Sequence, residues 1–472
     1  MEVKTSRAFA LDALRGYAIL TMVLSGTIAS TLPRWMYHAQ VPPPDHKFDP
    51  SIFGITWVDL VFPFFLFAMG AAFPFSLGRK LEQGVSKLML AGSSVLRGLQ
   101  LAFFAIFIQH MYPWVVSEPQ DYKAWLTTLA AFVLMFPMFM RLPGKVKGWV
   151  RAVVKLLAYL IAVAMLFSVS YAGGRTFSLG FSNIIILVLA NMAIFGSVAY
   201  IFTFQKPLAR LAILPFVMAI LLTRLDGSSD GWQKLVMGYS PVPWLYSFYY
   251  LKYLFIVIPG SIAGEYLREW ISSAGDSSVV GREDKKLAWT MLVVALLLVV
   301  ANLYGLFTRQ LILNLLVTII LLTWGWLRLT KAVGSNAAFW RKLFVAGAYM
   351  LLVGLFFESF EGGIRKDHST FSYYFVTSGL AFMALIAFSV MCDVFRWSRA
   401  TSFLVMAGQN PMIAYVGSSM VVMPILSITG LWNYVNMLSN NAWDGLLRGL
   451  IITSMVALLA MFFTRIKWFW RT

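Results

Sequence analysis

Long apolar runs alternate with short polar connections along the whole chain. A spanning helix needs about 20 mostly apolar residues, and fourteen runs approach that length. They cover residues 11–31, 54–77, 92–112, 123–140, 152–171, 180–203, 208–223, 247–267, 287–307, 310–328, 342–360, 372–391, 402–428 and 446–464. The links within 180–223 and 287–328 are very short, so we expect 12 to 14 separate helices. The pattern predicts an all-α, polytopic transmembrane bundle that forms a single integral membrane domain over residues 1–472.

Basic residues gather in alternate connections, which orients the predicted bundle. Lys and Arg accumulate in cytoplasmic connections, and the even-numbered connections hold most of them, for example Arg79, Lys80 and Lys87. This bias predicts both termini in the cytoplasm and the connection after the first helix on the extracytoplasmic side. It also explains the net charge of +18, so we expect membrane lipid and no nucleic acid as a partner.

Composition excludes a soluble protein. The chain is 60% hydrophobic and only 12% charged, and apolar surface on this scale requires lipid as its solvent.

The lone cysteine, Cys392, rules out a disulfide framework. The first apolar run carries Asp12 and Arg15 and lacks a small-residue cleavage pattern, so we expect a retained first helix and no signal peptide.

Asp12 and Arg15 lie three residues apart at the cytoplasmic start of the first helix. They share a helix face and can pair. One interpretation is a self-neutralising pair at the interface. The other is that Arg15 presents a fixed cation to an anionic cytosolic ligand such as a phosphate.

The stretch "AGQNPMIAYVGSSM" predicts an interruption of the thirteenth run near Gly408 and Gln409. Asn410 has the chemistry of an N-cap, and Pro411 suits the first helical turn. Free amide groups at a helix start inside the protein would favour an anion. A plain capped helix after a cytoplasmic loop is the alternative interpretation.

Asp59 is an acidic candidate within the second apolar run, in "TWVDLVFPFFLFAMG". Pro63 follows four residues later and cannot donate the backbone hydrogen bond that the Asp59 carbonyl would receive. An acidic side chain at such a position is costly in lipid, which indicates a functional site. A structural partner for a nearby Arg is the alternative.

Two extracytoplasmic connections hold titratable groups. The first, "RWMYHAQVPPPDHKF", contains His38 and His46, and histidine is the commonest general base. The second, "EGGIRKDHSTFSYY", mixes charges with tyrosines in the way a sugar-binding surface does, although a solvated loop would look the same. The four histidines lack Cys or carboxylate partners at ligand spacing, so we expect no metal.

Several stretches together resemble the transmembrane acetyltransferases that include lysosomal heparan-alpha-glucosaminide N-acetyltransferase and its bacterial relatives. They are "LDALRGYAILTMVL", "HA" followed by "TWVDLVFPFFLFAMG", "IPGSIAGEYL", "IRKDHSTFSYYFVTSG" with "MCDVFRW", and "GQNPMIAYVG". They occur in family order within two core stretches, 11–112 and 250–420, and the chain looks closest to a bacterial branch of N-acetylglucosamine-related membrane proteins.

The resemblance implies an enzyme of a bacterial inner (plasma) membrane that uses acetyl-CoA as co-substrate. The acetyl group would pass from cytosolic acetyl-CoA to a glucosamine-type amino sugar on the far side. The family's active histidine falls on His38 and its aspartate on Asp59. We expect Asp12, Arg15, Gln409 and Asn410 to bind the co-substrate, and Lys366 and Tyr373 to lie near the sugar. A homodimer is compatible with the sequence.

Two departures from the family pattern keep alternatives open. Gly26 stands where the family places an asparagine, and "VPPPDHKFDPSIFG" is inserted between His38 and Asp59, so His46 is a rival for the base. Direct attack by the amine and an acetyl-histidine intermediate both remain open. The alternatives to N-acetylation are a transporter of N-acetylglucosamine or chitin fragments that performs no chemistry, and an O-acetyltransferase of an envelope glycan.

Overall fold

The computed structural model describes residues 8–140, 147–223, 231–273 and 282–470, and these residues contain helices but no strand. Twelve of the described helices are long and apolar enough to span a membrane. They are α1 (Phe9–Thr27), α2 (Trp57–Ala71) continued by η2 (Pro74–Gly78) and α3 (Arg79–Glu82), α4 (Lys87–Met111), α6 (Tyr122–Phe139), α7 (Gly148–Ser168), α8 (Ile184–Phe202), α13 (Arg282–Phe307), α14 (Leu311–Thr330), α15 (Ser335–Phe360), α16 (Phe371–Ser389) continued by η5 (Val390–Val394), α18 (Pro411–Gly417) continued by η6 (Ser418–Val422) and α19 (Met423–Ile428), and α21 (Ala442–Arg465). The multi-pass, all-α class is therefore confirmed.

The other two predicted runs are helical but fall short as spans. One forms α9 (Pro207–Leu211) and α10 (Ile213–Leu222), which together are short, and the other is α12 (Leu254–Ser273), whose second half carries Glu265, Arg268 and Glu269. The remaining described helices are η1 (Arg34–Met36), α5 (Pro113–Val116), η3 (Ala172–Gly174), α11 (Trp232–Gly238), η4 (Phe248–Tyr253), α17 (Ser398–Gln409) and α20 (Leu431–Met437). The prediction of cytoplasmic termini concerns residues 1–7 and 471–472, which lie outside the described residues.

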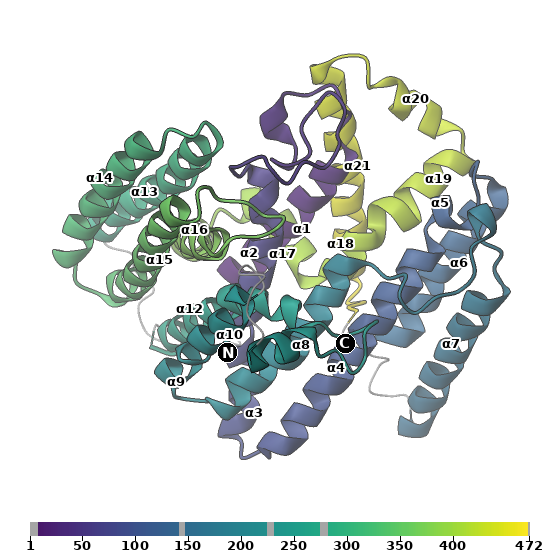
Figure 1. Ribbon diagram of the computed structural model, residues 1–472, viewed down its shortest axis with the longest axis horizontal. Coiled ribbons are helices and arrows are strands. Elements are labelled where there is room, and N and C mark those ends of the chain that lie inside the picture. The colour runs from purple at the N-terminus through teal and green to yellow at the C-terminus, as the bar shows by residue number, and fades with distance from the viewer. Residues whose placement is uncertain (1–7, 141–146, 224–230, 274–281, 471–472) are drawn as a thin grey trace.

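The helices form one bundle in which α16 is the most enclosed element. In Figure 1, α13 and α14 form one flank and α6 and α7 the other, with α1, α2 and α17 between them. The share of buried residues follows this arrangement, since it is 83% for the α16 span and 17% for α7. An element that is buried over most of its length and begins after the loop 361–370 can fix that loop against the first two helices.

Small residues bring α1 and α17 into backbone contact. A Cβ atom on Gly16 would lie 1.8 Å from the carbonyl oxygen of Leu404, and one on Gly408 would lie 1.9 Å from that of Asp12. Such glycine contacts allow close approach of membrane helices. As a result, Arg15 Nη1 lies close enough to donate a hydrogen bond to the Gly408 carbonyl, at 3.2 Å.

The predicted interruption of the thirteenth run is present, because α17 ends at Gln409 and α18 begins at Pro411. The prediction that Asn410 caps α18 is wrong. Its side-chain amide donates to the carbonyl of Trp468 at 2.8 Å and accepts from the amide of Trp470 at 3.2 Å. The C-terminal segment folds back into the bundle and occupies the hydrogen-bonding groups that a cap would need.

Candidate active site

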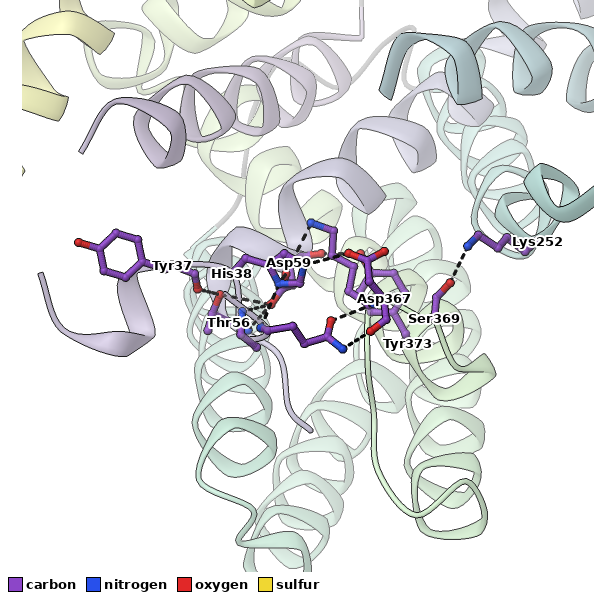
Figure 2. Close-up of polar contacts among 11 residues, drawn as sticks. Tyr37, His38, Thr56, Asp59, Lys252, Asp367, Ser369 and Tyr373 are labelled. Atoms are coloured by element: carbon purple, nitrogen blue, oxygen red, sulfur yellow. Dashed lines mark hydrogen bonds and ion pairs between the residues drawn. The ribbon is translucent and has the colours of Figure 1, made fainter. Parts of the chain in front are cut away.

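His38 lies between two carboxylates at the outer end of α2. Its Nδ1 is 2.9 Å from Oδ1 of Asp59, and its Nε2 is 3.0 Å from Oδ2 of Asp367. Figure 2 shows both contacts, with Asp59 contributed by α2 and Asp367 by the loop that precedes α16. The Asp59 side chain is fully buried, that of His38 is 16% exposed, and that of Asp367 is 44% exposed. The cluster therefore runs from the protein interior to the surface.

The local sequence fixes the carboxylate of Asp59. Thr56 precedes α2, and its amide donates to Oδ2 of Asp59 at 2.9 Å, while the amide of Ala39 donates to the same oxygen at 3.2 Å. Asp59 thus stands in the first helical turn, nearer the helix end than the sequence indicated. The positive end of the helix dipole also favours a carboxylate there. These bonds leave Oδ1 directed to His38.

Tyr373 compensates for the proline in α2. Pro63 removes the backbone donor for the carbonyl of Asp59, and the hydroxyl of Tyr373 donates to that carbonyl at 2.8 Å. The Tyr373 side chain is fully buried. Its hydroxyl supports the turn of α2 that carries the carboxylate, and its placement near a sugar stays a prediction.

Gln40 joins the two loop segments of the site, the one after α1 and the one before α16. Its Oε1 accepts from the amide of Asp367 at 2.9 Å, and its Nε2 donates to the carbonyl of the same residue. Glu361 holds the other end of the loop, because its carboxylate accepts from the amides of Phe371 and Ser372 at the start of α16. Asp367 is therefore presented to His38 by a loop that is anchored on both sides.

Two lysines offset the acidic groups. Nζ of Lys366 is 3.7 Å from Oδ1 of Asp59. Lys252 is buried and donates to the hydroxyl of Ser369 at 2.8 Å, next to the same loop (Figure 2). Of the two residues that the sequence placed near a sugar, Lys366 thus lies beside the carboxylates and is 23% exposed.

The carboxylates control the charge of the imidazole. Burial alone would lower the pKa of His38, but the hydrogen bonds to Asp367 and Asp59 outweigh it and raise that pKa above its ordinary value. Burial acts to raise the pKa of Asp367, yet the contact with His38 and the nearby lysines hold it below the usual range. The two carboxylates therefore favour the protonated form of the imidazole.

The other candidate histidines lie elsewhere. His46 packs against the ring of Tyr37, with ring centroids 4.6 Å apart, and its Nε2 is 3.3 Å from the carbonyl oxygen of Ser30. His110 is buried among aromatic rings, and its Nδ1 lies 2.8 Å from the carbonyl oxygen of Ile106. The structure thus brings His38, and not His46, to Asp59.

The insertion between His38 and Asp59 packs over the site loop. The amide of Gly54 donates to the carbonyl of Ile364 at 2.8 Å, and Arg365 Nη1 donates to the carbonyl of Pro50 at 3.1 Å. The guanidinium of Arg365 also lies over the ring of Phe53. The inserted residues therefore help to hold the loop that carries Asp367.

Three of the four predicted co-substrate residues line one cavity. Asp12, Arg15 and Gln409 border a space of about 390 Å³ between α1, α2, α4 and α17. Arg15 Nη1 is 3.5 Å from Asp12 Oδ1, as expected for a pair on one face. Arg97 of α4 adds a second guanidinium to the wall. Asn410 is fully buried and faces the C-terminal segment.

A row of α2 residues leads from this cavity toward His38. Met69 and Phe65 line the cavity, and a smaller apolar space of about 20 Å³ shares Phe65 and reaches Phe62. Phe62 is one turn from Asp59 on the same helix face. Met69 follows Asp59 by ten positions along α2, which corresponds to a rise of about 15 Å. The cation-lined cavity and the histidine site are thus connected along one helix.

Sequence reasoning missed the specific roles of Asp367, Gln40 and Arg97. The chain does contain a signal for one of them, since Arg97 interrupts the apolar run of α4 and an intramembrane cation indicates a site. The spacing of Thr56 and Asp59 matches a helix-start motif, which would have located the carboxylate at the end of α2. Gln40 and Asp367 lie 327 positions apart, and no local pattern pairs them.

A family model described as a domain of unknown function, DUF5009, matches residues 7–267. The match includes α1, α2, His38 and Asp59, as well as Arg15 and Arg97, and it ends before the loop that carries Asp367. A search of curated proteins finds no match to the chain.

Proposed function

The chain belongs to the DUF5009 family, and we propose that it is a transmembrane acetyltransferase. In this proposal it moves an acetyl group from cytosolic acetyl-CoA to a glucosamine-type amino sugar on the extracytoplasmic side of a bacterial inner membrane. The observation that carries the proposal is the imidazole of His38, held by the buried carboxylate of Asp59 at one end of α2, with a cation-lined cavity at the other end. The resemblance noted from the sequence supports the same chemistry.

Asp59 would act as a positioning residue. It would accept from Nδ1 of His38 and leave Nε2, which faces the half-exposed carboxylate of Asp367, as the reacting nitrogen. A carboxylate on Nδ1 stabilises the imidazolium and so makes the neutral imidazole a stronger base. Amine acylation requires such a base, because the attacking nitrogen must lose a proton.

In direct transfer, the neutral amine attacks the thioester carbonyl. A carbon–nitrogen bond forms and the carbon–sulfur bond breaks. The coenzyme thiolate leaves, and Nε2 of His38 accepts the proton that the amine loses. In the covalent route, Nε2 itself attacks the carbonyl and the thiolate departs, after which the amine takes the acetyl group from the imidazole. Both routes use the same nitrogen.

The cavity bordered by Asp12, Arg15 and Gln409, the inner cavity, fits the anionic part of acetyl-CoA. Arg15 and Arg97 offer guanidinium groups for phosphate oxygens. The apolar residues Phe65 and Phe62 continue from the cavity toward His38. This arrangement suits a long, uncharged thioester arm that reaches across the membrane from an anionic end. The side chains around the 20 Å³ space must part to admit it.

The decisive experiment uses the full chain, purified in detergent, with labelled acetyl-CoA and glucosamine. We expect labelled N-acetylglucosamine from the wild type. His38→Ala should lower kcat by about 100-fold to 10,000-fold, the usual contribution of a general base. His46→Ala is the matched control, because it removes an imidazole from the same segment without touching Asp59, and it should retain activity.

Three results would each overturn a part of this proposal. If the wild type transfers no label to any amino sugar but catalyses saturable sugar uptake into proteoliposomes, the chain is a transporter. If His46→Ala loses transfer and His38→Ala keeps it, the base is His46. Transfer to hydroxyl groups of a glycan, with none to amines, would instead identify an O-acetyltransferase.

A further inference from the structure

Asp367 occupies the nitrogen of His38 that the proposed chemistry needs. Its Oδ2 lies 3.0 Å from Nε2, while Asp59 holds Nδ1. While His38 is protonated and its Nε2 donates to Asp367, this nitrogen cannot accept a proton. Any reaction at Nε2 therefore requires that Asp367 exchange its imidazole partner for another group.

The exposure of the two carboxylates decides which of them can replace its imidazole partner by a ligand. The Asp59 side chain is fully buried, whereas that of Asp367 is 44% exposed to the extracytoplasmic side. The backbone of Asp367 is held in both directions by the buried side chain of Gln40. A ligand from outside can thus reach the carboxylate of Asp367 without unfolding the loop.

The charges in the cluster determine what kind of group fits. Asp59 and Asp367 supply two negative charges, and Lys366, 3.7 Å from Asp59, supplies one positive charge. The imidazolium of His38 supplies the second, and buried Lys252, bonded to Ser369 of the same loop, supplies a third near Asp367. If a neutral ligand displaced the imidazolium, Asp367 would lose a cation that contacts its carboxylate directly, at an electrostatic cost. A cationic ligand avoids that cost.

We propose that Asp367 is the acceptor-binding residue that selects a protonated amine, and that the ammonium group of the amino sugar takes the place of the His38 imidazolium on this carboxylate. The inference rests on the proposed acetyl transfer, whose acceptor it defines. As the ammonium binds, His38 releases its proton to solvent and keeps its Nδ1–H on Asp59. Nε2 is then neutral and lies next to the ammonium. It accepts one proton to free the amine for attack, and the second proton, lost as the amide forms, goes to the departing thiolate and gives the coenzyme thiol.

This exchange makes the base available only when the acceptor is present. It also explains why a hydroxyl acceptor is disfavoured, since an uncharged group cannot replace the imidazolium on Asp367. Sugar binding should therefore be accompanied by the release of one proton, and neutral sugars such as glucose or N-acetylglucosamine should bind far more weakly than glucosamine.

The test measures glucosamine binding to the purified full chain by calorimetry in buffers of different ionisation enthalpy, without acetyl-CoA. The wild type should bind glucosamine with release of one proton at a pH where His38 is protonated. Asp367→Asn should weaken binding by about 10- to 100-fold, the value of a charge-assisted hydrogen bond, and should abolish the proton release. Asp367→Glu should restore part of both effects.

Asp45→Asn is the matched control, because Asp45 is an exposed carboxylate in the neighbouring extracytoplasmic segment. It should leave binding and proton release unchanged. Size-exclusion profiles and melting temperatures verify that each variant is folded. In transfer assays, Asp367→Asn should raise the KM for glucosamine and leave the KM for acetyl-CoA unaltered.

The outcomes separate this inference from the proposed function. Unchanged glucosamine binding in Asp367→Asn, or no glucosamine binding by the wild type, would overturn the inference, whatever the transfer assay shows. Binding with proton release that depends on Asp367, in a protein that transfers no acetyl group, would uphold the inference and overturn the enzyme. Equal affinity of the wild type for glucose and glucosamine would also overturn it.

Discussion

The hydroxyl of Tyr373 donates a 2.8 Å hydrogen bond to the backbone carbonyl of Asp59. Pro63 leaves this carbonyl without a helical donor, so a residue of α16 completes the first turns of α2. The same bond joins the helix that carries the site carboxylate to the helix that follows the Asp367 loop. One buried hydroxyl thereby holds the two halves of the candidate site in register.

Tyr373→Phe should therefore impair both stability and function. It leaves a buried carbonyl unsatisfied, which costs about 1–3 kcal/mol, and it frees Asp59 to move relative to His38. We expect a lower melting temperature together with a lower kcat. Tyr171→Phe is the control, because Tyr171 donates a similar buried bond to the carbonyl of Leu166. It should lower the melting temperature alone, and an equal loss of kcat in the two variants would contradict this role for Tyr373.

The sequence predicted the fold class well because spanning helices are long and their apolar pattern is local. It also indicated Asp59, since an acidic residue within an apolar run has few purely structural explanations. The partners of that residue were harder to predict. Tyr373 and Asp59 lie 314 positions apart. From the sequence, Tyr373 is a tyrosine at the edge of a loop, and only the packing around α16 shows that its side chain is buried. Asn410 has a side chain that can cap a helix, but that side chain instead forms hydrogen bonds with the backbone of Trp468 and Trp470.

His38 and Asp367 should make the stability of the protein fall, and its activity rise, as pH increases through the pKa of His38. The pKa of His38 is raised on folding and that of Asp367 is lowered. The contribution of His38 is complete below its unfolded pKa and is lost as pH rises through the folded value. That of Asp367 is complete above its unfolded pKa and is lost as pH falls through the folded value. The cluster should stabilise the protein most between about pH 4 and 6.5.

The kcat for acetyl transfer should instead increase as pH rises through the pKa of His38, because the base must be neutral. Melting temperatures and kcat measured over a pH series would check both trends. His38→Gln should remove the loss of stability above pH 6.5, whereas His46→Gln should keep it. A melting profile of His38→Gln that still falls over this range would assign the titration to another group.

The guanidinium groups of the inner cavity should bind the anionic end of the acetyl donor. Arg15→Gln and Arg97→Gln should each raise the KM for acetyl-CoA by about 10- to 100-fold, the range for a hydrogen bond to a charged group. The KM for glucosamine should stay constant, since the acceptor site is about 15 Å away along α2. Lys80→Gln is the control, because Lys80 is an exposed cation of the same half of the bundle.

Kinetics with acetyl-CoA and with a shortened acetyl-pantetheine donor would separate phosphate binding from general disruption. Loss of Arg15 or Arg97 should weaken only the donor that carries the phosphates. If both donors are weakened equally, the arginines support the bundle and do not bind the donor.

The contact of α1 with α17 should control the shape of the inner cavity. In Gly408→Ala, the new methyl group would lie 1.9 Å from the carbonyl oxygen of Asp12, so the two helices must separate and Arg15 must leave the Gly408 carbonyl. Overpacking should lower the free energy of unfolding by about 1–3 kcal/mol. We therefore expect a lower melting temperature and a higher KM for acetyl-CoA. Gly26→Ala is the matched control in α1, since no atom lies within 4 Å of its added Cβ. Both changes replace a helical glycine by alanine and so gain the same helix propensity, which leaves the helix contact as the difference between them. Equal melting temperatures and equal KM values for the two variants would mean that the α1–α17 contact does not set the cavity.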